Sequence, residues 1–247
     1  MSFRNLVGKI RRRLIRLRLK PIRVFCLHQV CPERDPVRCF ECDWVQSDLF
    51  MRKVLEMKKV YSFISLEEAR NKLKKDIFRG KKYAVLTFDD GYSSSFAVLK
   101  WLEDQRIPFT LFLNAKYLDG LSCSEHVLDL ARIGIPDMTE EELADGLYLT
   151  NKELCSLSSP IASIASHGYE HVNALSLNSC GFMDDVKNNF SVLNKFFKTI
   201  PFHAYTWGAH TPETDSVLKE MGIIPVLMDG EMNYNEAGVI HRETFPI

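Results

Sequence analysis

The stretch from Tyr83 to Tyr92 constrains the fold of this chain more than any other part of its sequence. Its first six residues, Tyr-Ala-Val-Leu-Thr-Phe, are apolar, aromatic or β-branched and follow a lysine-rich turn, which predicts a buried β-strand. Asp89 and Asp90 come directly after this strand. Two adjacent carboxylates there repel each other and lose hydration, so a metal ion or a proton must compensate them. Gly91 indicates a backbone position that needs positive φ or a close approach to a ligand.

A second apolar strand with a polar end is predicted from residue 161, and it carries His167 and His171. The ordinary interpretation of an isolated Asp-Asp-Gly is a strand exit whose acids face water. A single histidine is ordinarily a hydrogen-bonded surface or core residue. Histidines four residues apart, however, share one face of a helical turn and can both reach one cation. With a strand-end aspartate they supply two nitrogens and one oxygen, a catalytic metal set that leaves a position open for water.

The elements between these motifs predict a parallel sheet. A helix over residues 93–105 and a strand over 108–114 follow the acidic strand, giving a strand–helix–strand unit of about thirty residues. Other strands are expected over residues 22–30, 62–64, 202–208, 223–228 and 239–242. Six residues lie just past predicted strand ends, namely Asp89, Asp90, Asn114, His167, Trp207 and Asp229. In a parallel barrel these ends share one rim, which predicts a single site there.

Capping patterns mark the starts of several predicted helices. Ser65 with Glu68 and Thr150 with Glu153 form capping boxes, and Asp48 can cap a helix of its own. Helices are expected over residues 48–59, 65–75, 93–105, 150–157, 176–197 and 214–221. Residues 115–149 interrupt the alternation of strands and helices, and we interpret them as an insertion with two short helices, a candidate lid in which His126 faces solvent.

The motifs Thr-Phe-Asp-Asp-Gly-Tyr at residues 87–92 and Ser-His-Gly-Tyr-Glu-His at residues 166–171 resemble those of the polysaccharide deacetylase family, carbohydrate esterase family 4. The resemblance covers the chain from Ile22 onward, apart from the insertion. It implies an α/β fold, a distorted (β/α) barrel with a mostly parallel sheet. It also implies hydrolysis of N-acetyl groups on an amino sugar or N-acetylated glycan. By motif position, Asp90, His167 and His171 would hold a divalent metal ion, expected to be zinc, and Asp89 would be the general base.

Two further site residues are implied by the same resemblance. The backbone N–H in the Trp207 strand exit would stabilise the oxyanion, and His241 would donate a proton to the leaving amine. The third motif of the family usually carries an arginine or a Pro-rich turn, and the exit at Trp207 has neither. Arg242 can instead match an arginine that short family members carry, which would leave His241 structural. His28, where the family often has Tyr-His, is either a site residue or a core histidine.

Two other classes of function remain open. The departure in the third motif suggests a barrel that has lost catalysis and binds a glycan or a partner. A metal phosphoesterase would also suit the aspartate pair and the two histidines, but lysine and arginine are sparse near the motifs.

Charge is distributed unevenly along the chain. The 247 residues have no net charge, yet nine basic residues and no acid precede residue 24, and the remainder has a net charge of −9. Residues 1–21 therefore form a basic arm, with Leu6, Ile10, Leu14 and Leu17 along one side of a predicted helix. A solvated arm, a membrane-surface helix and a nucleic-acid arm are the alternatives. Apolar residues opposite arginines favour an anionic membrane surface as the partner of residues 1–20, and no nucleic acid is expected.

The cysteines and the start of the chain bear on its location. No uninterrupted apolar core follows the basic residues, so a secretory signal is not expected. Seven cysteines, an odd count, then indicate a reducing compartment and free thiols. Cys39 and Cys42 form a C-x-x-C, but without a second such pair we expect no structural zinc site. We therefore expect residues 22–247 to be a cytoplasmic barrel domain, peripheral on the inner membrane face through its arm.

Overall fold

The computed structural model describes residues 22–35, 39, 43–75, 81–118, 122–134, 139–157, 160–231, 233 and 238–247. The basic arm and Cys42 lie outside these residues, so the predictions made for them stay predictions. Within the described part of the chain, no helix is both long enough and apolar enough to span a membrane.

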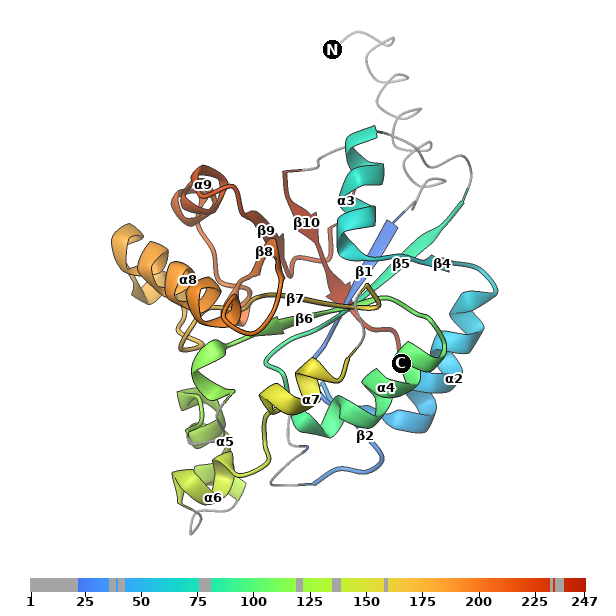
Figure 1. Cartoon of the computed structure of the whole chain (residues 1–247), viewed down its shortest axis with the longest axis horizontal. Helices are drawn as coiled ribbons and strands as arrows, with labels where there is room; N and C mark the ends of the chain where they lie inside the picture. Colours follow the sequence, from blue (N-terminus) through green and yellow to red (C-terminus); the bar gives the residue numbers. More distant parts are fainter. Residues whose placement is uncertain are drawn as a thin grey trace, which may run out of the picture.

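Parallel strands form a nearly closed barrel in the middle of the molecule (Figure 1). The order of pairing is β10-β9-β8-β7-β6-β5-β1-β11, and β4 pairs with the first half of β5. Every pairing in this sheet is parallel. The strands are β1 (Ile22–Leu27), β4 (Ser62–Phe63), β5 (Tyr83–Phe88), β6 (Phe109–Leu113), β7 (Ala162–Ser166), β8 (Thr199–Ala204), β9 (Ile224–Leu227), β10 (Ile240–His241) and β11 (Glu243–Thr244). The predicted (β/α) barrel is confirmed. A separate pair joins β2 (Val30–Cys31) to β3 (Val45–Gln46).

The barrel closes through one short segment, residues 240–244. Its first part, β10, pairs with β9, and its last part, β11, pairs with β1. The side chains of Arg23 and Glu243 form an ion pair across the β1–β11 contact. Arg242 lies between the two halves of the segment, and its backbone N–H donates to the carbonyl of Leu227 at 2.7 Å. The segment therefore joins the two edges of the sheet.

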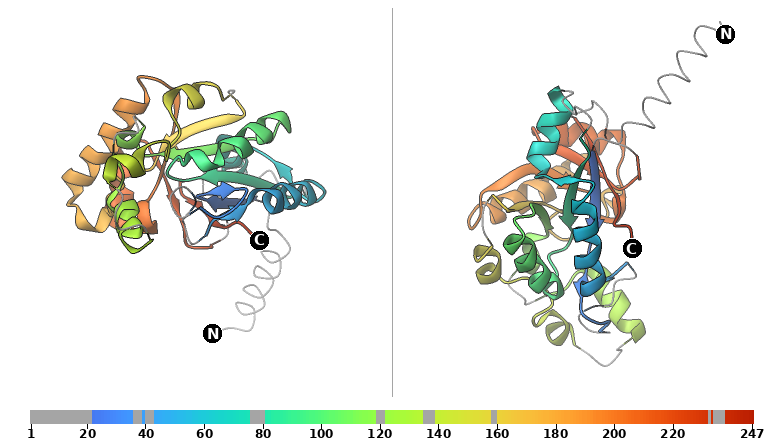
Figure 2. Two further views of the ribbon diagram at one scale, coloured as in Figure 1. Left: turned by 90° about the horizontal axis from the view of Figure 1, so that it is seen from below. Right: turned by 90° about the vertical axis from the view of Figure 1, so that its right-hand side faces the viewer.

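Helices surround the barrel, and Figure 2 shows from two further directions that they lie outside the strands. They are α2 (Ser47–Lys58), α3 (Leu66–Lys75), α4 (Phe96–Asp104), α5 (Glu125–Gly134), α6 (Glu140–Ala144), α7 (Asn151–Cys155), α8 (Ser179–Leu193) and α9 (Pro212–Glu220). The capping box of Thr150 and Glu153 is confirmed, and Ser65 Oγ accepts from the N–H of Glu68 at 3.1 Å. The predicted cap at Asp48 is wrong, because Asp48 lies inside the first turn of α2. A 3₁₀ turn, Ser93–Ser95, precedes α4 where one continuous helix was predicted.

The strand β5 is buried along its whole length, as its apolar sequence predicts. Its side chains alternate between two hydrophobic clusters: Leu86 and Phe88 pack in one with α2 and α4, and Val85 packs in the other with α3. The strand is therefore anchored on both faces, and this fixes the position of the residues that follow it.

The segment predicted to be an insertion forms a small core of its own around α5 and α6. The rings of Tyr92, Tyr148 and Tyr117 stack in series, with centroids 5.6 and 5.5 Å apart. His126 does not simply face solvent as predicted, because its ring lies 4.5 Å from that of Trp207. The insertion thus packs directly against the residues that follow β5.

The cysteines correct one further prediction. A disulfide joins Cys31, the last residue of β2, to Cys39 in the following loop, where free thiols were expected. Among the described residues, the cysteines outside this bond are Cys26, Cys123, Cys155 and Cys180.

Candidate active site

A cavity of about 360 Å³ opens at the carboxyl ends of the barrel strands. Five predicted site residues line it, namely Asp89, Asp90, His167, His171 and Trp207. They come from the ends of β5, β7 and β8, which are far apart in sequence but meet at one rim of the sheet. The convergence predicted from the strand ends is therefore present.

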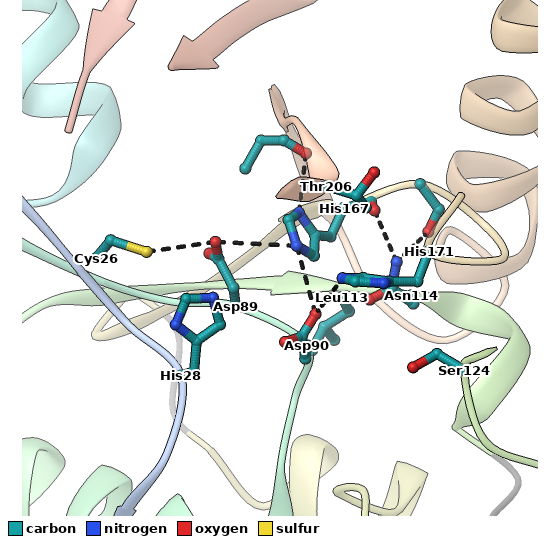
Figure 3. Close-up of polar contacts among 12 residues, drawn as sticks. Cys26, His28, Asp89, Asp90, Leu113, Asn114, Ser124, His167, His171 and Thr206 are labelled. Carbon is teal, nitrogen blue, oxygen red and sulfur yellow. Dashed lines mark hydrogen bonds and ion pairs between the residues drawn. The ribbon is translucent and has the colours of Figure 1, made fainter. Parts of the chain in front are cut away.

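Asp90, His167 and His171 form a cluster that could hold a metal ion (Figure 3). Their ligand atoms lie within 4.8 Å of one another. Asp90 Oδ1 lies 3.4 Å from His167 Nε2 and 3.2 Å from His171 Nε2, yet it is buried and accepts no hydrogen bond. Burial alone would raise the pKa of Asp90, but the two imidazoles hold it well below its usual range. A buried carboxylate oxygen without a donor, facing two imidazole nitrogens, fits a divalent cation.

The tautomer of His167 suits a metal ligand. Its Nδ1 lies 2.9 Å from the carbonyl oxygen of Ala204, which can only accept, so Nδ1 carries the proton. Nε2 then presents its lone pair toward Asp90. Burial lowers the pKa of His167, which favours the neutral form that binds metals.

The two histidines meet through a loop, not through the helical turn that their spacing predicted. Asn114 donates from Nδ2 to the carbonyls of His167 and Gly168 at 2.7 and 2.9 Å. Asp185, on α8, accepts from the N–H of Tyr169 at 3.0 Å. Gly168 has φ +82°, and a Cβ there would meet Asp185 Oδ2 at 2.9 Å. Residues outside the motif therefore set the shape of the loop.

Three site residues adopt the left-handed backbone region. Asp90, His171 and Trp207 have φ values of 65°, 55° and 60°. Such conformations cost about 1–3 kcal/mol each in a non-glycine residue and persist where the surroundings fix them. Gly91, with φ 76°, confirms the prediction for that position, and its missing Cβ makes room for Leu113. This local strain coincides with the rim that carries the metal cluster.

Asp89 is held by a buried arginine. The guanidinium of Arg242 donates from Nη1 to Oδ1 at 2.6 Å and from Nη2 to Oδ2 at 2.8 Å. The side chains of Arg242 and Asp89 are only 1% and 3% exposed. Burial alone would raise the pKa of Asp89, but the positive charge of Arg242 and of nearby imidazoles holds it below its usual value. Asp89 is therefore an ionised carboxylate beside the metal cluster, fixed by two parallel hydrogen bonds.

His28 lines the other side of the cavity. Its Nδ1 donates to Asp43 Oδ2 at 2.7 Å. Burial opposes a charge on this imidazole, but the hydrogen bond with Asp43 and the charges of Asp90 and Asp89 raise the pKa of His28 to about 10. His28 can therefore carry a proton into the cavity.

His241 is not among the residues of this cavity. Its Nδ1 lies 2.8 Å from Asp229 Oδ2, and it lines a separate small cavity with Arg23 and Glu243. Asn114 also lies behind the site, as a support for the histidine loop. Of the six strand-end residues, Asn114 and Asp229 thus do not face the cavity.

Sequence reasoning missed several of these contacts. It weighed Arg242 and His28 only as alternatives, because the inward face of a strand end cannot be assigned without its register. Asp43 and Asp185 had no signal, because Asp43 is in an irregular loop and Asp185 is a partly exposed residue of α8 outside both motifs. Asn189 gives no signal either, yet its buried side chain donates to the carbonyl of Leu113 and to Ser166 Oγ, both at 2.8 Å.

No curated protein sequence matches this chain. Among solved structures it is similar to IcaB from Ammonifex degensii, with 19% identity, 92% of each chain covered and a TM-score of 0.71. It is also similar to the deacetylase PplD from Streptococcus pyogenes, with 18% identity, 92% of each chain covered and a TM-score of 0.72. These similarities show a shared fold.

A third similar structure is a de-N-acetylase from Aggregatibacter actinomycetemcomitans, with 12% identity, 90% of this chain and 94% of that chain covered, and a TM-score of 0.69. The family model for polysaccharide deacetylases matches residues 78–226, more than half of the chain, and the match includes both motifs. The chain belongs to the polysaccharide deacetylase family, hydrolases that act on the carbon–nitrogen bonds of N-acetylated sugars.

Proposed function

We propose that this protein is a metal-dependent deacetylase of an N-acetylated amino sugar or glycan. One observation carries the proposal: an ionised carboxylate, Asp89, is held by Arg242 beside a cluster of Asp90, His167 and His171 that suits a divalent cation. Zinc is the ion expected from two imidazoles and one carboxylate. When bound, such an ion polarises the amide carbonyl and makes water a better nucleophile.

Asp89 acts as the general base. As water attacks the acetyl carbon, a C–O bond forms and Asp89 takes the proton that the water loses. Arg242 leaves Asp89 little freedom, since both carboxylate oxygens are engaged, and this fixes the direction of the accepting lone pairs. The backbone N–H in the exit that contains Trp207 is the proposed donor to the developing oxyanion.

His28 is the proposed general acid. As the C–N bond breaks, the amine nitrogen needs a proton, and a protonated His28 lines the same cavity opposite the metal cluster. Asp43 holds the imidazole through Nδ1, which leaves Nε2 to donate. His241 would have to leave Asp229 to reach the cavity, so it is the rival for this role.

The proposed metal and base are tested by separating metal binding from turnover. His167→Ala should lose the ion held by this cluster, so elemental analysis should find one equivalent of metal fewer than in the wild type. Asp89→Asn should retain it while acetate release falls by about 10²–10⁴, the usual contribution of a general base. Asp184→Asn makes the same change at an exposed position of α8 and should change neither the amount of bound ion nor the rate of acetate release. Full metal occupancy in His167→Ala, or undiminished turnover in Asp89→Asn, would remove these assignments.

The proposed acid is tested by comparing His28→Gln with His241→Gln. We expect His28→Gln to slow release of an N-acetyl group by about 10²–10⁴ and His241→Gln to have little effect. The loss in His28→Gln should be smaller with an O-acetyl substrate, because an alkoxide leaves more readily than an unprotonated amine. The opposite ranking of the two variants would make His241 the acid.

The alternative of a catalytically weakened barrel depended on the apparent lack of an arginine near the base. The contact between Arg242 and Asp89 removes that reason. The phosphoesterase alternative gains no support either, since Arg242, which among the described residues is the arginine lining the cavity, is engaged by Asp89.

The membrane role of the basic arm and the cytoplasmic location are proposals that rest on sequence, and the Cys31–Cys39 disulfide removes the free-thiol argument for the location. Each basic residue near an anionic bilayer contributes roughly 1 kcal/mol, so the eight within residues 1–20 could hold the protein at a membrane. The full chain should sediment with anionic vesicles at low salt, and deletion of residues 1–20 should release it. Failure of the full chain to bind such vesicles would contradict this role for the arm.

A further inference from the structure

A second group of potential metal ligands shares the cavity with the first. Cys26, His28 and Asp89 each offer one ligand atom, and these atoms lie within 4.8 Å of one another. Figure 3 shows Cys26 beside Asp89 on the side away from His171, with His28 next to both acids. We propose that Cys26, His28 and Asp89 form a second, inhibitory site for a thiophilic divalent cation such as zinc.

The distances suit this ion. With Zn–S near 2.3 Å and Zn–N or Zn–O near 2.0–2.2 Å, neighbouring ligand atoms in a tetrahedral site lie about 3.3–3.7 Å apart. Cys26 Sγ and Asp89 Oδ2 are already 3.4 Å apart. The other separations, within 4.8 Å, need to close by up to about 1.5 Å, which side-chain rotation can supply. The cavity on the open side leaves room for a fourth ligand from solvent.

His28 is oriented as a metal ligand. Its Nδ1 donates to Asp43, which leaves the lone pair of Nε2 available once the second proton is lost. This carboxylate–imidazole arrangement is the usual outer-shell support of a metal-bound histidine.

Cys26 makes the site selective. A bound cation must displace the proton of the Cys26 thiol to solvent, because a thiol binds metal as the thiolate. Thiolate sulfur favours zinc and other soft ions, whereas magnesium and calcium favour oxygen ligands. The site should therefore prefer soft divalent cations such as zinc over magnesium and calcium, which carry the same charge.

The charges in the cavity allow two divalent ions. Among the described residues, Asp43, Asp89, Asp90 and Arg242 line it. With the imidazoles neutral, as metal binding requires of His28, the formal charge is −2, and it becomes −3 when the thiol loses its proton. Two divalent ions bring this to +1, which coordinated solvent anions can offset. Arg242 does not block the site, since each carboxylate oxygen of Asp89 has a second lone pair.

Occupation of this site would inhibit the enzyme, and this part of the inference rests on the proposed function. The cation would engage the lone pairs of Asp89, the proposed base, and of His28, the proposed acid. Activity should therefore rise with the first equivalent of zinc and fall with the second, while excess magnesium should have no such effect.

Metal stoichiometry tests the site independently of activity. The wild-type protein should bind two zinc ions in equilibrium dialysis, and Cys26→Ser and His28→Gln should each bind one. Cys155→Ser, which changes an exposed cysteine, should still bind two. The cobalt form of the wild type should show a thiolate-to-cobalt charge-transfer band that Cys26→Ser lacks. Because even outer-shell changes cost about 10–100-fold in affinity, inhibition of Cys26→Ser should need at least about tenfold more zinc.

His167→Ala separates this inference from the proposed function. It should lose the ion of the first site and keep one ion with the thiolate band, and His167→Ala combined with Cys26→Ser should bind none. A wild type that binds one ion without the band, or a Cys26→Ser variant that binds two, would overturn the second site and leave the deacetylase proposal intact. A wild type that binds no ion would overturn both. Matched thermal unfolding of the variants excludes misfolding as the cause.

Discussion

Replacement of the buried Arg242 by methionine should destabilise the protein far more than the same replacement of the more exposed Arg23. The change removes two charge-assisted hydrogen bonds, at 2.6 and 2.8 Å, and leaves Asp89 charged in a site where its side chain is 3% exposed. Removing one partner of a buried ion pair costs about 3–5 kcal/mol, because the remaining charge has neither water nor a counter-ion. Methionine retains much of the buried aliphatic volume, so a cavity contributes little to this loss.

Arg23→Met is the matched control. Arg23 pairs with Glu243 on the same seam between β1 and β11, but these side chains are 23% and 31% exposed. Pairs with this access to water contribute about 0–1 kcal/mol. Urea unfolding of the metal-free proteins at pH 7 gives both values, and an unchanged slope against denaturant shows that the difference is one of stability.

The double variant Arg242→Met, Asp89→Asn identifies the cause. If the loss arises from the uncompensated charge, the neutral amide should make the double variant more stable than Arg242→Met alone. Equal losses in Arg242→Met and Arg23→Met, or no recovery in the double variant, would refute the reasoning.

Three other predictions concern the supports of the site. Burial lowers the pKa of His203 to about 3, so below pH 6.5 the unfolded state binds a proton that the folded state does not. The free energy of unfolding should therefore fall by up to about 1.4 kcal/mol per pH unit as the pH is lowered. His203→Gln should reduce this slope, measured by urea unfolding between pH 6.5 and 4.5. Gly168→Ala should weaken zinc binding at least about tenfold by calorimetry, because its Cβ would meet Asp185 at 2.9 Å, whereas Gly181→Ala, with its nearest contact at 3.5 Å, should not. Thr150→Ala should cost about 0.5–2 kcal/mol in thermal unfolding through loss of the cap of α7.

The strands and the residues at their ends could be predicted from local sequence. A run such as Tyr83–Phe88 is long, apolar and bounded by a turn, and the whole of it is buried as β5. Once parallel strands are inferred, the shared rim brings Asp90 and His167 together without further information. Barrel geometry therefore converts a local pattern into a long-range contact.

The choice between His241 and Arg242 could not be made in the same way. Adjacent residues of an extended segment point to opposite sides, so a shift of one residue in the matched motif exchanges the inward and outward positions. The structure places Arg242 inward on Asp89 and His241 outward on Asp229. The sequence contains both residues but no turn or spacing that decides between them.

The histidine loop was mispredicted for a different reason. The spacing of His167 and His171 is that of a helical turn, and the positive φ of Gly168 and His171 prevents one. That backbone is selected by Asp185 and Asn114, which lie on other elements. Contacts of this kind depend on tertiary structure and leave no local pattern.

The seam at residues 240–244 has a consequence for biosynthesis. Arg242 follows Asp89 by 153 residues, so on the ribosome it is the last of the site residues to be made. Until this segment docks between β9 and β1, Asp89 has no cationic partner, and nothing fixes the direction of its accepting lone pairs. A chain that has folded only as far as β9 could already assemble Asp90 with both histidines and take up a metal ion, yet it would lack a competent base. Hydrolysis would then begin only when translation has passed the seam, and metal loading would precede activity in the life of each molecule.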